Sequence, residues 1–117
     1  MFPYERLEVY KKAFQTNQKV YWLIKENTRI VSYIKNQLGR ACLSVMLNIA
    51  EGSAKFSPKD RRNFFITARG SAFECSSLIC FLHSEGEIVD EYKDELYASF
   101  NEISKILYTM IKNLEAR

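Results

Sequence analysis

The sequence predicts an all-α protein, an up-down-up-down bundle of four antiparallel helices. The prediction rests on four segments with helical hydrophobic periodicity, on the short breaks between them, and on the lack of any stretch that alternates convincingly with period two. Gly and Pro number only 4 and 2 in 117 residues, which also favours helix. Long helices joined by short connections pack as antiparallel neighbours. The length suits one domain, residues 1–117, and the 47% apolar content is enough for a core.

The first predicted helix spans residues 4–26, and Pro3 suits its entry. The second predicted helix spans residues 29–54, with Asn27 or Thr28 as its cap and Gly52 helping to end it. In the first helix, residues spaced by three and four form one face. They are Leu7, Tyr10, Phe14, Asn17, Tyr21 and Ile24.

The third predicted helix has a clear start signal. Ser57 fits the N-cap, Pro58 the first helical position and Asp60 the acidic third position. This helix runs to about residue 83, the "SEGE" segment around Gly86 interrupts the pattern, and the fourth helix spans residues 89–116. The buried positions predicted for these two helices are Phe65, Ala68, Ala72, Cys75, Ile79 and Leu82, then Leu96, Phe100, Ile103, Leu107, Met110 and Leu114.

The second predicted helix is apolar on more sides than a surface helix needs. On a helical wheel its polar residues share one arc of about 80°. One of the remaining apolar sides can face the bundle core. A second apolar side must be shielded from water in another way, and a subunit interface is the simplest way to do so. We therefore predict a homo-oligomer with Leu43, Met46, Leu47 or Ala50 near the subunit contact. The polar arc consists of Gln37, Arg40, Ser44, Asn48 and Glu51.

A polar network is the predicted role of this arc. Ser71 and Glu74 lie on a seam of the third helix that can face it. Because unpaired buried charge is very costly, an enclosed Arg40 needs a partner, and Glu74 is one candidate. We predict a largely enclosed network of Arg40, Asn48, Glu51 and Glu74, either between these helices or across a subunit boundary. A network that fixes helix register and a ligand or catalytic site both remain open.

Charge divides the chain into two halves. Residues 1–70 contain 13 Lys/Arg and 5 Asp/Glu, a net +8, whereas residues 71–117 contain 4 and 9, a net −5. Such asymmetry can indicate a polyanion partner or a self-complementary surface, and an ordinary solvated surface is the simpler alternative. Phe56, in the turn, could stack on a base. The predicted nucleic-acid-binding residues are Lys55, Lys59, Arg61, Arg62 and Arg69, with additional charge from Lys11, Lys12, Lys19 and Lys25.

Other classes of function receive little support. The chain has one His, no phosphate-binding loop and no recognisable nucleophile–base pair, so we expect no enzyme and no cofactor. Cys42, Cys75 and Cys80 form no CxxC motif, and the Cys80–His83 pair alone is a weak metal signal. The start of the sequence lacks a secretory apolar region, and the most apolar run, residues 41–50, is too short to span a bilayer. We expect a cytoplasmic protein without a membrane partner.

The segment "QLGRACLSVMLNIAEGSAKFSPKDRRNFFITARGSAFE" resembles the bacterial four-helix-bundle family of 23S ribosomal RNA intervening-sequence proteins. One departure is Gly39, where that family commonly has a second Arg beside Arg40. The flanking helices also fit, so the resemblance spans nearly the whole chain. The matching positions are Gln37, Leu38, Arg40, Ala41, Ser44, Asn48, Ile49, Ala50, Glu51, Gly52, Lys55, Ser57, Asp60, Gly70, Ser71 and Glu74.

The resemblance implies a four-helix bundle that assembles as a ring-like homopentamer. The accessory protein of diversity-generating retroelements is similar, and it is a basic pentamer implicated in nucleic-acid binding. Together with the basic cluster, this favours a protein that binds RNA or DNA with little base specificity. The alternative is a structural or scaffold protein whose partner is itself or another protein.

Overall fold

The computed structural model describes residues 1–116, in which four α-helices follow a short 3₁₀ helix and no strand occurs. This confirms the predicted all-α class with four helices. The elements are η1 (Pro3–Arg6), α1 (Glu8–Glu26), α2 (Ser32–Ala54), α3 (Pro58–Ser84) and α4 (Asp90–Glu115).

The start of α2 differs from the prediction. The side-chain oxygen of Asn27 accepts hydrogen bonds from the backbone N–H groups of Arg29 and Ile30, at 2.8 and 3.2 Å. Asn27 therefore closes a turn before the helix instead of capping it, and α2 begins only at Ser32, after an extended Val31. The predicted first helix is likewise divided, because Leu7 is extended between η1 and α1.

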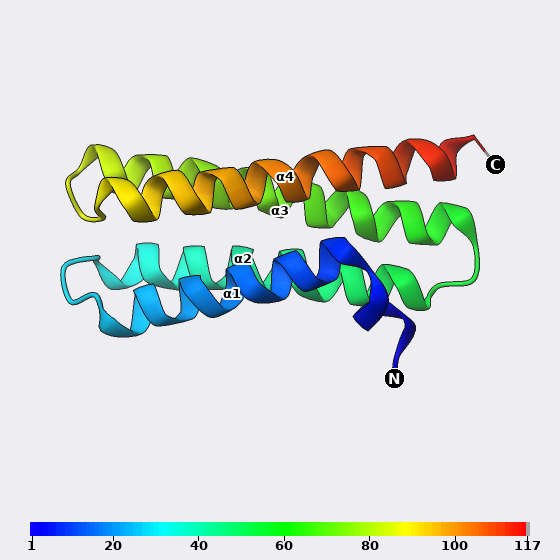
Figure 1. Cartoon of the computed structure of the whole chain (residues 1–117), viewed down its shortest axis with the longest axis horizontal. Coiled ribbons are helices and arrows are strands. Elements are labelled where there is room, and N and C mark those ends of the chain that lie inside the picture. The colour runs from blue at the N-terminus through cyan, green and yellow to red at the C-terminus, as the bar shows by residue number, and fades with distance from the viewer. Residues whose placement is uncertain (117) are drawn as a thin grey trace.

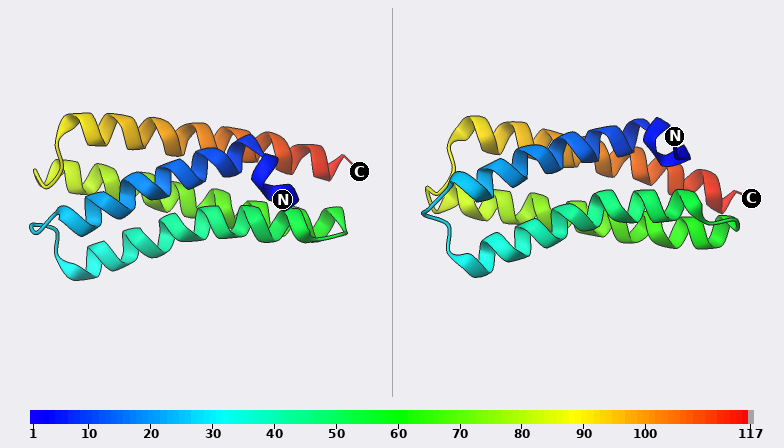
Figure 2. Two further views of the ribbon diagram at one scale, coloured as in Figure 1. Left: turned by 60° about the horizontal axis from the view of Figure 1, so that its bottom comes forward. Right: turned by 90° about the horizontal axis from the view of Figure 1, so that it is seen from below.

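The four helices form a four-sided bundle 46 Å long and 26 by 22 Å across (Figure 1). Each helix packs against its two neighbours around the bundle. The α1–α2 and α3–α4 connections lie at one end of the molecule. The α2–α3 connection and both ends of the chain lie at the other end (Figure 2). Residues distant in sequence therefore meet at each end.

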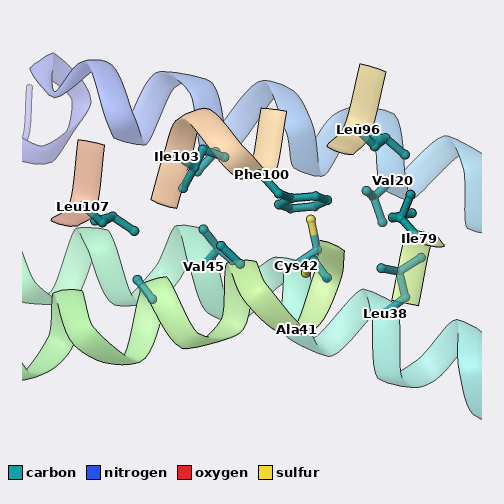
Figure 3. Packing of buried hydrophobic residues seen from close by; sticks show 14 of the residues in the cluster. Val20, Leu38, Ala41, Cys42, Val45, Ile79, Leu96, Phe100, Ile103 and Leu107 are labelled. Carbon is teal, nitrogen blue, oxygen red and sulfur yellow. The ribbon is translucent and has the colours of Figure 1, made fainter. Parts of the chain in front are cut away.

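The core runs along the bundle axis and receives side chains from every α-helix (Figure 3). All six positions predicted for α3 are buried, as are Leu96, Phe100, Ile103 and Leu107 of α4. In α1 the predicted face is rotated from the core face. Leu7, Tyr10 and Ile24 are half-buried against the core, whereas Phe14 and Tyr21 are about half exposed. Aromatic residues flank the true core face, which the shorter side chains occupy. The buried residues of α1 are Val9, Ala13, Thr16, Val20 and Leu23.

Gly52 has a different role from the predicted one. The helix does not end there but continues to Ala54, and Gly52 is buried against α3. A Cβ atom at this position would lie 3.0 Å from Cβ of Phe64 and 2.7 Å from Cε1 of Phe65, and the second distance is shorter than real Cβ atoms approach. The absence of a side chain therefore lets α2 and α3 pack closely beside their connection.

Among residues 1–116, α3 alone is long and apolar enough to resemble a membrane-spanning segment, a property that core helices of soluble proteins share. Its apolar face, which includes Phe65, Cys75 and Ile79, is buried in the bundle. No three His, Cys, Asp or Glu side chains of the described chain gather as a potential metal site.

Candidate nucleic-acid interface

The α2–α3 connection, residues 55–57, is short and held by hydrogen bonds at both sides. The backbone N–H of Lys55 donates to the carbonyl of Gly52 at 3.2 Å. The Ser57 side chain accepts from the backbone N–H of Asp60 at 3.1 Å, and Pro58 occupies the first helical turn, as predicted. A connection this short has no room to fold back on the bundle, so its side chains project from the end.

The side chains at the α2–α3 connection are therefore exposed to solvent. Phe56 is fully exposed, at 102% relative accessibility, and Lys55 and Lys59 are exposed beside it. The Lys55 ammonium lies 5.0 Å from the ring centroid of Phe64, so that ring is occupied while Phe56 remains uncovered. An apolar ring held in water next to ammonium groups can stack on an unpaired base while the cations contact phosphates.

The three predicted arginines are more constrained than the lysines. Arg61 and Arg62 are half-buried at the same end, and Arg62 Nη1 lies 3.6 Å from Glu115 Oε1. Their Nε atoms, like that of Arg69, are buried without a hydrogen-bond partner in the described chain. The stems of these side chains therefore support packing, and only their guanidinium ends are available to an anion.

Arg69 lies apart from the other four predicted residues. It is ten residues from Lys59, about 15 Å along the helix. Its guanidinium lies 4.7 Å from the ring of Phe73 and 5.4 Å from that of Tyr108, on the side formed by α3 and α4. The cluster at the end of the bundle thus contains Lys55, Lys59, Arg61 and Arg62, which we call the basic end.

The fold adds one basic residue that sequence reasoning missed. Lys112 Nζ lies 3.3 Å from Glu115 Oε2, so Lys112 and Arg62 share the same carboxylate. Lys112 is fifty residues from Arg62 in sequence. No local signal joins the two residues, and only the return of α4 to this end brings them together.

The polar stripe of α2 reaches α3 through two side-chain contacts, and a third contact joins two residues of α2 itself. The hydroxyls of Ser44 and Ser71 lie 2.8 Å apart, Asn48 donates to the Ser44 hydroxyl at 3.0 Å, and Gln37 donates to the Glu74 carboxylate. The Ser44–Ser71 and Gln37–Glu74 contacts tie the two neighbouring helices together, whereas the Asn48 bond lies within α2. The three contacts involve five of the seven residues assigned to the polar network: Gln37, Ser44, Asn48, Ser71 and Glu74.

The charged members of the stripe differ from the prediction. Arg40 and Glu51 are exposed and make no ion pair or side-chain hydrogen bond within residues 1–116, and Glu74 bonds to Gln37 instead of Arg40. Within one chain the network is therefore not enclosed. The physical reason is that these residues point away from the α2 core face, so water can solvate their charges at no desolvation cost.

The cysteines show no sign of reactivity. Cys42 and Cys75 are buried and Cys80 is half-buried. A hydrogen bond with Cys42, together with burial, raises the pKa of the Cys75 thiol above its ordinary value. A thiol that stays protonated is a poor nucleophile and a poor metal ligand. His83 has no cysteine partner and instead lies 2.6 Å from Asp90 Oδ1.

The α3–α4 connection, at the opposite end of the bundle, has the opposite charge. Its α3–α4 connection, residues 85–89, contains Glu85 and Glu87 and is followed by Asp90 and Glu91. Gly86 has φ +74°, and the N–H of Glu87 donates to the Leu82 carbonyl at 2.9 Å, which closes the end of α3 as a Schellman motif. We call residues 84–91 the acidic end.

Fold and surface define a class of protein, a small four-helix bundle with a basic α2–α3 connection at one end and an acidic α3–α4 connection at the other. The model of the 23S rRNA-intervening sequence protein family matches residues 5–109, and the chain belongs to this family. A crystal structure from Bacteroides thetaiotaomicron, of a protein with unknown function from the S23 ribosomal protein family, is similar. Its TM-score is 0.83 at 25% identity, covering 89% of this chain and 98% of that one. Among curated proteins, none matches this sequence.

Proposed function

We propose that this protein is a non-enzymatic homo-oligomer that binds RNA or DNA through its basic end with little base specificity. The observation that carries the proposal is the composition of residues 55–62, with four basic residues against one acidic residue at an exposed end. Phosphate binding requires only convergent positive charge and no sequence motif. The fully exposed Phe56 adds a stacking surface that favours single strands, whose bases are accessible.

The proposed assembly is a ring-like homopentamer of up-down-up-down bundles. The placement of the three connections at alternating ends supports this helix order (Figure 1). Leu43 and Leu47, which were predicted near a subunit contact, are 47% and 50% exposed, so burial by another subunit would be favourable. A ring would present several basic ends together and turn weak contacts into useful avidity.

A scaffold role is the second candidate, and the acidic end supports it. Residues 84–91 contain four acidic residues and no basic residue. This end could dock the basic end of another subunit or of a different protein, without nucleic acid. Both candidates keep the expectations of a cytoplasmic location and of no cofactor, metal or membrane partner.

A titration against labelled single- and double-stranded RNA and DNA separates the two candidates. We expect binding at about 50 mM salt that weakens steeply as salt rises, because each neutralised phosphate releases counterions. Single strands should bind more tightly than a duplex of equal length, and Phe56→Ala should remove this preference while leaving the salt dependence unchanged. No binding of any of the four at about 50 mM salt would favour the scaffold role.

A further inference from the structure

A groove of about 740 Å³ runs between α1 and α2 on one long side of the bundle. Three basic residues and no acidic residue line it, and the rest of its lining is mainly aromatic and aliphatic. The groove therefore fits an occupant that combines apolar side chains with negative charge. The basic lining residues are Lys25, Lys35 and Arg40.

Gly39 leaves the floor of this groove open. A Cβ atom at position 39 would lie 3.5 Å from Cδ1 of Ile24, an ordinary contact, so alanine fits there. A larger side chain would have to extend into the groove. The walls expose apolar surface to water, with Phe14 at 45%, Tyr21 at 58% and Leu43 at 47% exposure. Such a surface is more stable when covered.

The opposite long side, formed by α3 and α4, also exposes aromatic rings. Phe73 is 55% and Tyr97 45% exposed, and both line a smaller groove of about 160 Å³. Asp90 and Asp94 are exposed on α4 near Tyr97 in sequence. Within the chain Asp90 contacts His83 and Asp94 lies 3.7 Å from Lys93, but the two carboxylate side chains remain 83% and 75% exposed. This side thus offers rings to fill the first groove and solvent-exposed carboxylates to its basic residues.

Polar contacts cross the other two sides of the bundle. Between α1 and α4, Lys12 Nζ lies 2.6 Å from Glu102 Oε2, and Lys19 pairs with Glu95. Between α2 and α3, the pair Ser44–Ser71 and the pair Gln37–Glu74 are hydrogen-bonded. These side chains are engaged within the chain and have less to gain from a partner. The rings of the first two sides have a cation over one face, Lys25 over Tyr21, Arg69 over Phe73 and Lys93 over Tyr97, yet each ring remains about half exposed.

We propose that the α1–α2 groove receives the α3–α4 side of a second copy of this chain. A side of 46 by 22 Å presents about 1,000 Å², which suffices for the roughly 800 Å² that each partner buries in a standard interface. Because the two contacting surfaces are different, the contact is head-to-tail and can close into a ring. The inference rests on the proposed oligomer and specifies which of its surfaces meet.

Two blocking variants and their mixture test this pairing by light scattering at micromolar concentration. Gly39→Phe fills the groove, and the double variant Phe73→Glu/Tyr97→Glu charges the α3–α4 side. We expect each variant alone to be monomeric and helical by circular dichroism. Their mixture should form one-to-one dimers and nothing larger, because it retains one intact groove and one intact ring surface per pair. Gly39→Ala, the matched control, should assemble like the wild type.

The remaining outcomes separate this inference from the proposed function. A monomeric wild type would overturn the assembly and with it the pairing. An oligomeric wild type with an equally oligomeric, folded Gly39→Phe variant would overturn the pairing alone. Loss of assembly in Gly39→Phe but not in the α3–α4 variant would indicate that two grooves face each other. If Gly39→Phe abolishes oligonucleotide binding and the α3–α4 variant does not, the occupant of the groove is nucleic acid instead of a second subunit.

Discussion

The two ends of α3 are built by similar means and differ in charge. At its start Ser57 caps the helix, and at its end Gly86 closes a Schellman motif, so both connections are short and hydrogen-bonded. Residues 55–62 nevertheless carry a net +3, from four basic residues and one acidic residue, whereas residues 84–91 carry −4. Asp90 and Glu91 lie in the first turn of α4, where the helix dipole favours negative charge, and Arg62 pairs with Glu115. The hydrogen bonds of neither turn use the side chains of Lys55, Lys59, Glu85 or Glu87, so the fold does not explain those charges. Their separation is therefore evidence about partners.

Charge reversal at either end should have the largest effect. We expect Lys55→Glu/Lys59→Glu to weaken oligonucleotide binding by on the order of tenfold for each lost phosphate contact at about 50 mM salt. The matched reversal at the acidic end, Glu85→Lys/Glu87→Lys, should leave binding unchanged or strengthen it. Fluorescence anisotropy measures both. An equal loss from the two reversals would mean that binding does not depend on the basic end.

Packing beside the basic end supplies the second prediction. Gly52→Ala should destabilise the protein by about 1–3 kcal/mol, because its methyl group would clash with Phe65. Gly70→Ala is the control, since no atom would lie within 4 Å of the added Cβ. It should stabilise the helix by up to about 1 kcal/mol. Urea unfolding gives both values, and a neutral Gly52→Ala would show that α2 and α3 can separate here at little cost.

The two caps should contribute comparably. Ser57→Ala removes the hydrogen bond to Asp60 and should cost about 1 kcal/mol. Gly86→Ala forces a side chain into a left-handed conformation at φ +74° and should cost about 1–2 kcal/mol. Thermal or urea unfolding measures the free energy of unfolding of both variants. A loss of stability in only one variant would show that the two caps do not contribute equally.

The polar stripe should give the smallest effects. Arg40 is exposed and unpaired within residues 1–116, so Arg40→Ala should change stability by less than about 0.5 kcal/mol in a monomeric variant. Ser44→Ala and Ser71→Ala should be coupled by about 0.5–1.5 kcal/mol, because their hydroxyls share one hydrogen bond. A much larger cost for Arg40→Ala would mean that another subunit encloses its charge.

The sequence predicts those features of the structure that depend on residues close together in the chain. Ser57, Pro58 and Asp60 define the start of α3, and apolar spacing identifies its buried face, because both depend on neighbouring residues only. In α1 the rule selects a face rotated from the core face, since Phe14 and Tyr21 have the spacing of core residues while they line a groove. The tight contact of Gly52 with Phe65 and the meeting of Lys112 with Arg62 depend on how distant helices pack, which no local pattern encodes.

Site-specific photocrosslinking tests the central claim, that nucleic acid binds at the basic end, most directly. A benzophenone amino acid can replace Phe56 at the basic end or Val89 at the acidic end, both of which are exposed apolar residues. At about 50 mM salt, the probe at position 56 should crosslink to a labelled single-stranded oligonucleotide, and the probe at position 89 should not. Crosslinking at neither position, or equally at both, would contradict the account.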